Sequence, residues 1–336
     1  MQILTASVLV FPMLTALVSL SGSDYKITIE SSNNLNDWNS IHTSTVSSEE
    51  PNSFYRAVIE PINEPAPTLE STTLTLTQTW SQETNFSRTA HVQVPVSSTE
   101  KYPVIIFLHG AGGSGSNMLT QYSNNFEEYI KVGMDGYQNK WNIKNEPTKA
   151  DDIGFLDAII SQLKSYSNVD SEKITLFGVS NGAGLTLKAL VELPEDTFNH
   201  AIHLVTQLTT DQYRDGKFWY NEYPSDEYII EKTLPNRAKI ISFHGTDDTV
   251  IPYEGGMVTW LNRTFFDAHE SIFYFAKAKG YSGEILSGNG LNTINVNIKA
   301  YPYLNQSIVH YKILEGSHGL NEYKNDIVSI VRSHIE

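Results

Sequence analysis

Hydrophobic and polar positions change period repeatedly along the chain from about residue 68 onward. Alternation at residues 73–80 and 90–94 predicts two opening strands, and an uninterrupted apolar run at 103–108 predicts a strand buried on both faces. Apolar residues on one helical face predict amphipathic helices, one of them preceded by Asp151 and Asp152. Strands that alternate with helices predict an α/β fold with a mostly parallel central sheet flanked by helices. The further predicted strands are 173–179, 239–243 and 308–314, and the predicted helices are 153–166, 183–193 and 323–335.

The first 67 residues have a different pattern. Residues 24–60 contain short β-like runs, at 25–29 and 54–58, between turns rich in serine and asparagine, so we expect a small β-rich segment. Prolines at positions 61, 65 and 67 predict an extended linker over residues 61–67, because proline fixes the backbone. We therefore expect the main domain to span residues 68–336. A spacer or packing strap explains the small segment better than a binding domain does.

Residues 3–20 form an apolar stretch without charged side chains, and the small residues Ser21, Gly22 and Ser23 follow it. This order predicts a signal peptide over residues 1–23, and a secreted or periplasmic protein with no stable membrane association after cleavage. The match is imperfect, because no Lys or Arg precedes the stretch and Pro12 interrupts it. An uncleaved membrane anchor of about 18 residues is the alternative.

Charge and cysteine content exclude several classes of function. The 336 residues include 38 acidic and 23 basic side chains, a formal net charge of −15, which disfavours nucleic acid and anionic membranes as partners. The absence of cysteine excludes disulfides, thiolate catalysis and cysteine-ligated zinc. Histidine and acidic residues show no zinc-binding spacing and no H-E-x-x-H pattern, so we expect no metal and no cofactor.

A catalytic pattern occurs where a predicted strand ends and a predicted helix begins. The sequence GVSNG at residues 178–182 matches G-x-S-x-G, in which the serine takes a strained backbone on a tight turn between small neighbours. The pattern alone also occurs by chance, but here both flanking elements are predicted. Ser180 is therefore the candidate nucleophile, and a turn residue without chemistry is the alternative.

A serine nucleophile needs a general base, and the base needs a carboxylate that fixes its orientation. In folds of this kind the chain order is serine, acid, base, each in a loop that follows a strand. The sequence HGTDDTVIPY follows the predicted strand at 239–243 and offers two adjacent carboxylates, Asp247 and Asp248. The sequence EGSHGLN follows the predicted strand at 308–314 and contains the candidate base, His318.

Acyl transfer also needs backbone N–H groups that stabilise the negative charge of the transition state, the oxyanion hole. One donor is expected from Asn181, at the start of the helix after the nucleophile. The Gly-rich sequence LHGAGGSGSN at residues 108–117 should supply the second, from Ala111 or alternatively from Gly112. A phosphate-binding loop is the competing interpretation, but the sequence lacks the G-K-[ST] ending of such loops.

Four sequence blocks in this order resemble the polyhydroxybutyrate depolymerase-like esterases, a family of α/β-hydrolases that includes secreted feruloyl and acetylxylan esterases. The blocks are PVIIFLHGAGGSGSN, WN…ADDIGFLDAII, ITLFGVSNGAGL and ISFHGTDDTVIPYEGG, and the resemblance covers about residues 87–320. It implies the α/β-hydrolase fold, and it assigns the acid to Asp248, the second carboxylate of the family pattern H-G-T-x-D-x-x-V-P-Y. The family stretch G-G-G-H-x-W-P-G is GSHGL at residues 316–320 here, so His318 matches the base but the Trp-Pro pair is absent.

These features predict a secreted serine carboxylesterase that works through an acyl-enzyme. By the resemblance, its substrates are feruloyl or acetyl esters of polysaccharides, and a depolymerase of polyhydroxybutyrate or an aromatic polyester is the alternative. A serine peptidase and a non-catalytic binding protein on the same fold are more remote alternatives. Four aromatic residues are candidates for substrate contact, although their rings could equally pack the domain: Trp141, Phe218, Trp219 and Tyr220.

Overall fold

The computed structural model describes residues 25–32, 39–41, 54–61, 66–96, 101–144, 146–232 and 237–336. The chain divides into two compact units, Met1–Pro65 and Ala66–Glu336. In the first unit, β1 (Tyr25–Ser32) pairs antiparallel with β2 (Asn39–Ile41) and with β3 (Phe54–Pro61). The strands predicted at 25–29 and 54–58 are therefore present. The predicted signal peptide at 1–23 and most of the predicted linker lie outside the described residues, so their roles stay predictions.

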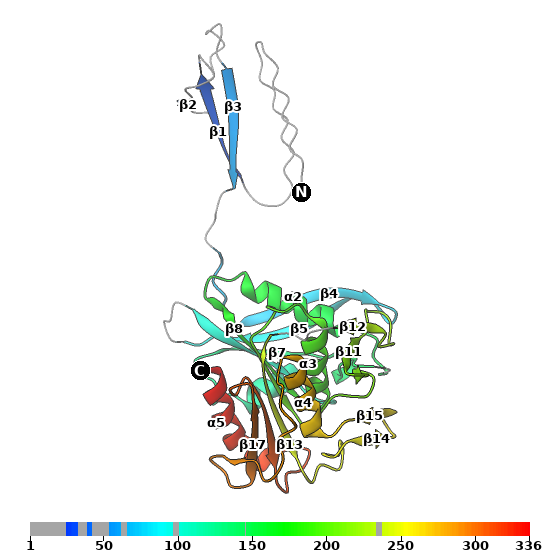
Figure 1. Ribbon diagram of the computed structural model, residues 1–336. Coiled ribbons are helices and arrows are strands. Elements are labelled where there is room, and N and C mark those ends of the chain that lie inside the picture. The colour runs from blue at the N-terminus through cyan, green and yellow to red at the C-terminus, as the bar shows by residue number, and fades with distance from the viewer. Residues whose placement is uncertain are drawn as a thin grey trace. The chain divides into compact units, whose positions relative to one another are not determined.

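One mixed sheet organises the second unit (Figure 1). Six neighbouring strands in its middle run parallel, and strands at both ends pair antiparallel. In order across the sheet, the described strands are β16 (Leu291–Asn292), β17 (Ile298–Tyr303), β18 (Ile308–Ile313), β13 (Lys239–Gly245), β9 (His200–Leu204), β8 (Val169–Val179), β6 (Tyr102–Leu108), β7 (Ile130–Met134), β5 (Glu83–Gln93) and β4 (Thr72–Trp80). The parallel part runs from β18 to β7, which agrees with the predicted α/β class.

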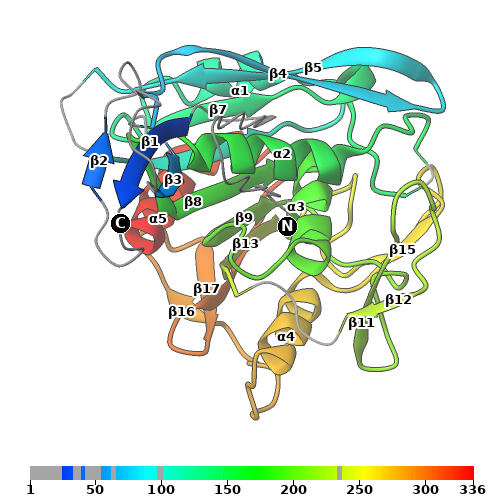
Figure 2. The same ribbon diagram turned by 90° about the horizontal axis from the view of Figure 1, so that it is seen from above.

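Helices flank this sheet, and smaller strands lie at one end of the unit (Figure 2). The described helices are α1 (Gly115–Gln121), α2 (Asp152–Lys164), α3 (Asn181–Glu192), α4 (Ala268–Ala278) and α5 (Lys324–Ile335), with 3-10 turns η1 (Tyr137–Asn139) and η2 (Asn321–Tyr323). The smaller strands are β10 (Tyr213–Arg214), β11 (Lys217–Tyr220), β12 (Ile230–Lys232), β14 (Gly256–Val258) and β15 (Arg263–Phe265). Within the part of the chain that the structure covers, no helix is both long enough and apolar enough to cross a membrane.

Every strand and helix expected from the sequence is present, with ends that shift by a few residues. The largest shift is at β5, which begins at Glu83 rather than at residue 90. The first half of β5 forms a hairpin with β4 and carries mostly polar side chains at the edge of the sheet, so its hydrophobic pattern gave no signal. The sequence did not predict β7, β9, β16 and β17 of the main sheet, helices α1 and α4, or the short strands β2, β10, β11, β12, β14 and β15.

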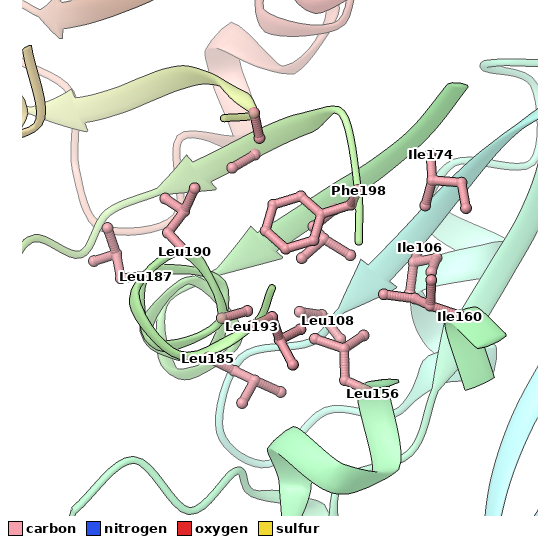
Figure 3. Close-up of a cluster of buried hydrophobic side chains, with 14 of the residues drawn as sticks. Ile106, Leu108, Leu156, Ile160, Ile174, Leu185, Leu187, Leu190, Leu193 and Phe198 are labelled. Atoms are coloured by element: carbon pink, nitrogen blue, oxygen red, sulfur yellow. The ribbon is translucent and has the colours of Figure 1, made fainter. Parts of the chain in front are cut away.

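The central strands are buried on both faces, as the apolar run of β6 predicts. Ile105 and Phe107 point to a cluster that α1 and α5 close, whereas Ile106 and Leu108 point to a larger cluster under α2 and α3. Figure 3 shows the second cluster, in which leucines of α3 pack against Phe198 and the strands. Each fully buried aliphatic side chain contributes about 1.5–3 kcal/mol. Two such layers hold the parallel strands in register, and with them the loops at their carboxyl ends.

A buried ion pair joins β5 to the start of α2. Arg88 Nη2 lies 2.5 Å from Asp152 Oδ1, and both side chains are almost completely buried. Asp152 Oδ2 accepts a second hydrogen bond from the backbone N–H of Asn142, at 2.6 Å. The neighbouring Asp151 caps the helix by accepting from the N–H of Gly154 at 2.8 Å. Of the two acidic residues expected at this helix start, one is thus the cap and the other is half of an ion pair.

Asp152→Asn should lower the free energy of unfolding by about 3 kcal/mol, because the neutral amide leaves the buried Arg88 guanidinium without a counter-ion. Urea denaturation of the purified chain measures this loss. Asp215→Asn, in an exposed turn, is the matched control and should change stability by less than about 0.5 kcal/mol. Equal stability of the two variants would mean that the ion pair contributes nothing.

Candidate active site

Ser180 occupies the tight turn between β8 and α3, with the backbone angles φ 52° and ψ −117°. A non-glycine residue rarely adopts this conformation, which persists only where the surroundings enforce it. Here the N–H of Ser180 donates to the carbonyl of Leu204 at 2.9 Å. Glycine is required on both sides, since a Cβ at Gly178 would collide with Thr186 Oγ1 and one at Gly182 would collide with the Leu108 carbonyl. The predicted nucleophile turn is therefore the geometry that the chain adopts.

The structure brings the three predicted residues of the triad into contact, although they lie far apart in the chain. His318 Nε2 is 2.9 Å from Ser180 Oγ, and His318 Nδ1 is 2.7 Å from Asp248 Oδ2. The loops that carry them follow β8, β13 and β18, whose carboxyl ends meet at one edge of the parallel sheet. His318 Nε2 thus faces the hydroxyl whose proton a general base removes, and Nδ1 contacts the carboxylate that orients the ring.

The geometry also separates the two candidate acids. The Asp248 side chain is fully buried, whereas Asp247 is exposed and accepts from the hydroxyl of Thr246, at 3.1 Å. Asp248 Oδ1 accepts from the backbone N–H groups of Val250 and Ile251, each at 2.9 Å. Only Asp248 contacts the base, in agreement with the assignment that the resemblance implied.

A second histidine, His244, contacts Asp248, and the sequence did not identify this role. His244 Nε2 lies 3.2 Å from Asp248 Oδ2 and 2.9 Å from the carbonyl of Ile251. Both partners are acceptors, so His244 Nε2 carries a proton and donates to them. Burial alone would raise the pKa of Asp248, but the hydrogen bonds from His244 and His318 outweigh it and hold that pKa well below its usual range. Asp248 therefore stays ionised at every pH at which the chain is expected to work.

The Gly-rich loop after β6 lies beside the nucleophile, since a Cβ added at Gly110 would lie 3.5 Å from the Ser180 Cβ. The N–H of Gly112 donates to the carbonyl of Asn139 at 2.8 Å, which removes Gly112 from the two candidates for the oxyanion hole. Within the described residues, the N–H groups of Ala111 and Asn181 have no hydrogen-bond partner. They remain available for a ligand oxygen, as the preferred assignment requires.

Trp141 holds this loop against the nucleophile turn. Its indole N–H donates to the carbonyl of His109 at 2.8 Å, and its ring is completely buried. The side-chain oxygen of Asn181 accepts from the N–H of Trp141 at 2.7 Å, and its side-chain nitrogen donates to the Trp141 carbonyl at 3.1 Å. Trp141 therefore connects the two predicted oxyanion donors but offers no ring surface to a ligand, which corrects its expected role in substrate contact.

The other aromatic candidates divide in the same way. Phe218 is buried and stacks on Phe275 of α4 at a centroid distance of 4.7 Å, so it packs the core instead of lining a binding surface. Trp219 and Tyr220 are partly exposed: the Trp219 ring contacts the Arg214 guanidinium, and Tyr220 lies near Lys232 and packs against the core. No contact joins either ring to the triad within the residues described. The aromatic composition of this stretch could not distinguish packing from binding.

Comparison with known proteins finds esterases, although no family model matches the chain. The chain is similar to feruloyl esterase B of Piromyces equi, at 28% identity over 194 residues, which are 54% of this chain and 33% of that protein. It therefore spans only a third of the length of that curated relative. The solved acetyl xylan esterase from Aspergillus awamori superposes with a TM-score of 0.50 and 14% identity, covering 75% of this chain and 98% of that one. The fold is thus the α/β-hydrolase fold, as predicted, and the resemblance to esterases is confirmed.

Asn181→Ala should lower the free energy of unfolding by about 2 kcal/mol, since it removes two hydrogen bonds to Trp141 worth about 1 kcal/mol each. Urea denaturation followed by tryptophan fluorescence measures the change. Asn117→Ala, on the exposed face of α1, is the control and should stay near wild type. An Asn181→Ala variant as stable as the control would contradict the proposed link between the two loops.

Proposed function

We propose that this protein is a serine carboxylesterase that hydrolyses its substrate through an acyl-enzyme. The observation that carries the proposal is the continuous chain of hydrogen bonds from Ser180 through His318 to Asp248. The similarity to feruloyl esterase B supports an ester as the substrate. Among the described residues, no group of side chains could hold a metal ion, and the proposed reaction requires none.

Each group has a distinct role in the proposed reaction. His318 Nε2 removes the proton from Ser180 Oγ as that oxygen attacks the ester carbonyl, and Asp248 stabilises the imidazolium that forms. The N–H groups of Ala111 and Asn181 donate to the oxyanion of the tetrahedral intermediate. His318 then gives its proton to the departing alcohol. A water molecule attacks the acyl-enzyme by the same route, which releases the acid and restores Ser180.

The substrates that we favour are feruloyl and acetyl esters of polysaccharides. We also propose that the protein is exported. The support is the sequence resemblance, the apolar stretch at residues 3–20 and the similarity to feruloyl esterase B. The net charge of −15 fits neutral esters better than polyanionic polymers.

Ser180→Ala should lower kcat by at least about 10³-fold, because nucleophile and base act as a unit. Product release from methyl ferulate, 4-nitrophenyl acetate, acetylated xylan and polyhydroxybutyrate film, by wild type and variant side by side, tests this. Labelling of the wild type by a fluorophosphonate probe, lost in the variant, is the control for an active nucleophile. If wild type releases no product from any of the four substrates and the probe does not label it, the proposal is overturned in favour of a binding protein. Polymer release that exceeds small-ester turnover would instead indicate a depolymerase.

Asp248→Ala should lower kcat by about 10⁴-fold, since it removes the carboxylate that orients His318. Asp247→Ala should cost less than about threefold, because that side chain is exposed and contacts only Thr246. Steady-state kinetics on 4-nitrophenyl acetate compare the two variants, which differ by one position in the same loop. The opposite ranking would transfer the role of the acid to Asp247.

A further inference from the structure

A cavity of about 340 Å³ lies beside the triad. The oxyanion loop at residues 109–114 lines the cavity, and the expected oxyanion donor Ala111 is one of its lining residues. Val179 and Gly319, the direct chain neighbours of Ser180 and His318, also line it. Residues of α1 and of the start of α5 line the cavity as well. An ester carbonyl bound at Ser180 would thus have one of its two substituents next to this cavity.

The cavity wall combines apolar and polar groups. Met118, Leu204 and Leu320 contribute apolar surface. Three amide side chains line it as well, and none of them forms a hydrogen bond with another described residue: Asn117, Gln121 and Asn321. Their donors and acceptors are available to a polar ligand.

Among the described residues that line the cavity, Lys324, the first residue of α5, is the only formally charged one. The one other titratable group with a basic nitrogen there is His109, and burial lowers its pKa, so it is neutral. Lys324 Nζ donates to the carbonyl of Gln121 and lies 5.0 Å from the ring centre of Tyr122. Among the residues that the structure describes, it forms no ion pair. An ammonium group can donate three hydrogen bonds, so two remain for a ligand.

We infer that the cavity binds a carboxylate-bearing substituent of the substrate ester, and that Lys324 and the neighbouring amides bind that carboxylate. The inference rests on the proposed esterase function and adds a substrate class to it, esters whose acyl or alcohol part carries one acid group. The cavity volume is at the lower end of those found for small-molecule sites, which suits a single substituent rather than a polymer chain.

Two pairs of esters test the inference, one for each side of the scissile bond. For the acyl side, 4-nitrophenyl hemisuccinate is compared with neutral 4-nitrophenyl butyrate. For the alcohol side, 4-acetoxybenzoate is compared with phenyl acetate. Lys324→Gln is the variant, because glutamine still offers a donor to the carbonyl of Gln121 but has no charge. Differences in leaving group cancel when the variant is compared with wild type on the same ester.

Lys324→Gln should lower kcat/KM about tenfold for the charged ester of one pair, because the variant loses one hydrogen bond between charged groups. The neutral esters should change less than about twofold. Lys324→Arg should retain the wild-type preference for the charged ester over its neutral partner. Lys299→Gln, which removes a lysine bonded to Asn292 outside the cavity, should leave this preference unchanged. Melting temperatures of all variants exclude a general loss of structure.

Equal losses on the charged and neutral esters of both pairs would overturn the inference and leave the esterase function intact. The inference would also be overturned, with the esterase function intact, if Lys324→Arg lost the preference for the charged ester as fully as Lys324→Gln. If wild type hydrolyses none of the four esters and a fluorophosphonate probe does not label Ser180, the proposed function itself fails. The two failures are therefore distinguishable.

Discussion

The buried carboxylate of Asp248 is the interaction around which the candidate site is arranged. A charge removed from water costs several kcal/mol unless hydrogen bonds replace its solvation. Asp248 has four donors: two backbone N–H groups of its own loop, His244 and His318. The loop after β13 must curl round the carboxylate to supply the first two, so the shape of the loop and the ionisation of Asp248 stabilise each other. His244 also holds this loop, because its Nε2 donates to the carbonyl of Ile251.

A second constraint sets the position of the nucleophile relative to the oxyanion loop. The turn at Ser180 brings α3 so close to β6 that only glycine fits at position 182. This contact places Asn181 beside Trp141, whose indole holds the loop at His109. The backbone next to Trp141 is held in turn by Asp152, which pairs with Arg88. The two proposed oxyanion donors are thus oriented without a substrate, and in the proposed reaction preorganised donors of this kind contribute most to transition-state stabilisation.

The parts of this site that the sequence predicted are those with local signals. A tight turn demands small residues at fixed spacing, and the acid and base follow buried strands whose apolar runs are plain in the sequence. The unpredicted parts depend on contacts between distant residues. Arg88 lies in a polar stretch of β5 without any motif, yet it is buried against Asp152. Trp141 and Phe218 show the converse, since aromatic composition is the same for a ring that packs a core and a ring that binds a ligand.

Net charge and local charge act over different distances at this site. The chain carries −15 overall, which repels anions, but the Debye length at physiological ionic strength is about 8 Å. Most of the acidic side chains therefore have little effect on a small monoanion that has already reached the cavity. What acts there is the wall itself, where Lys324 is the only formal charge and the neutral ring of His109 adds none. A chain that disfavours polyanions can thus still prefer an ester with a single carboxylate, because the repulsion is screened and the hydrogen bonds are not.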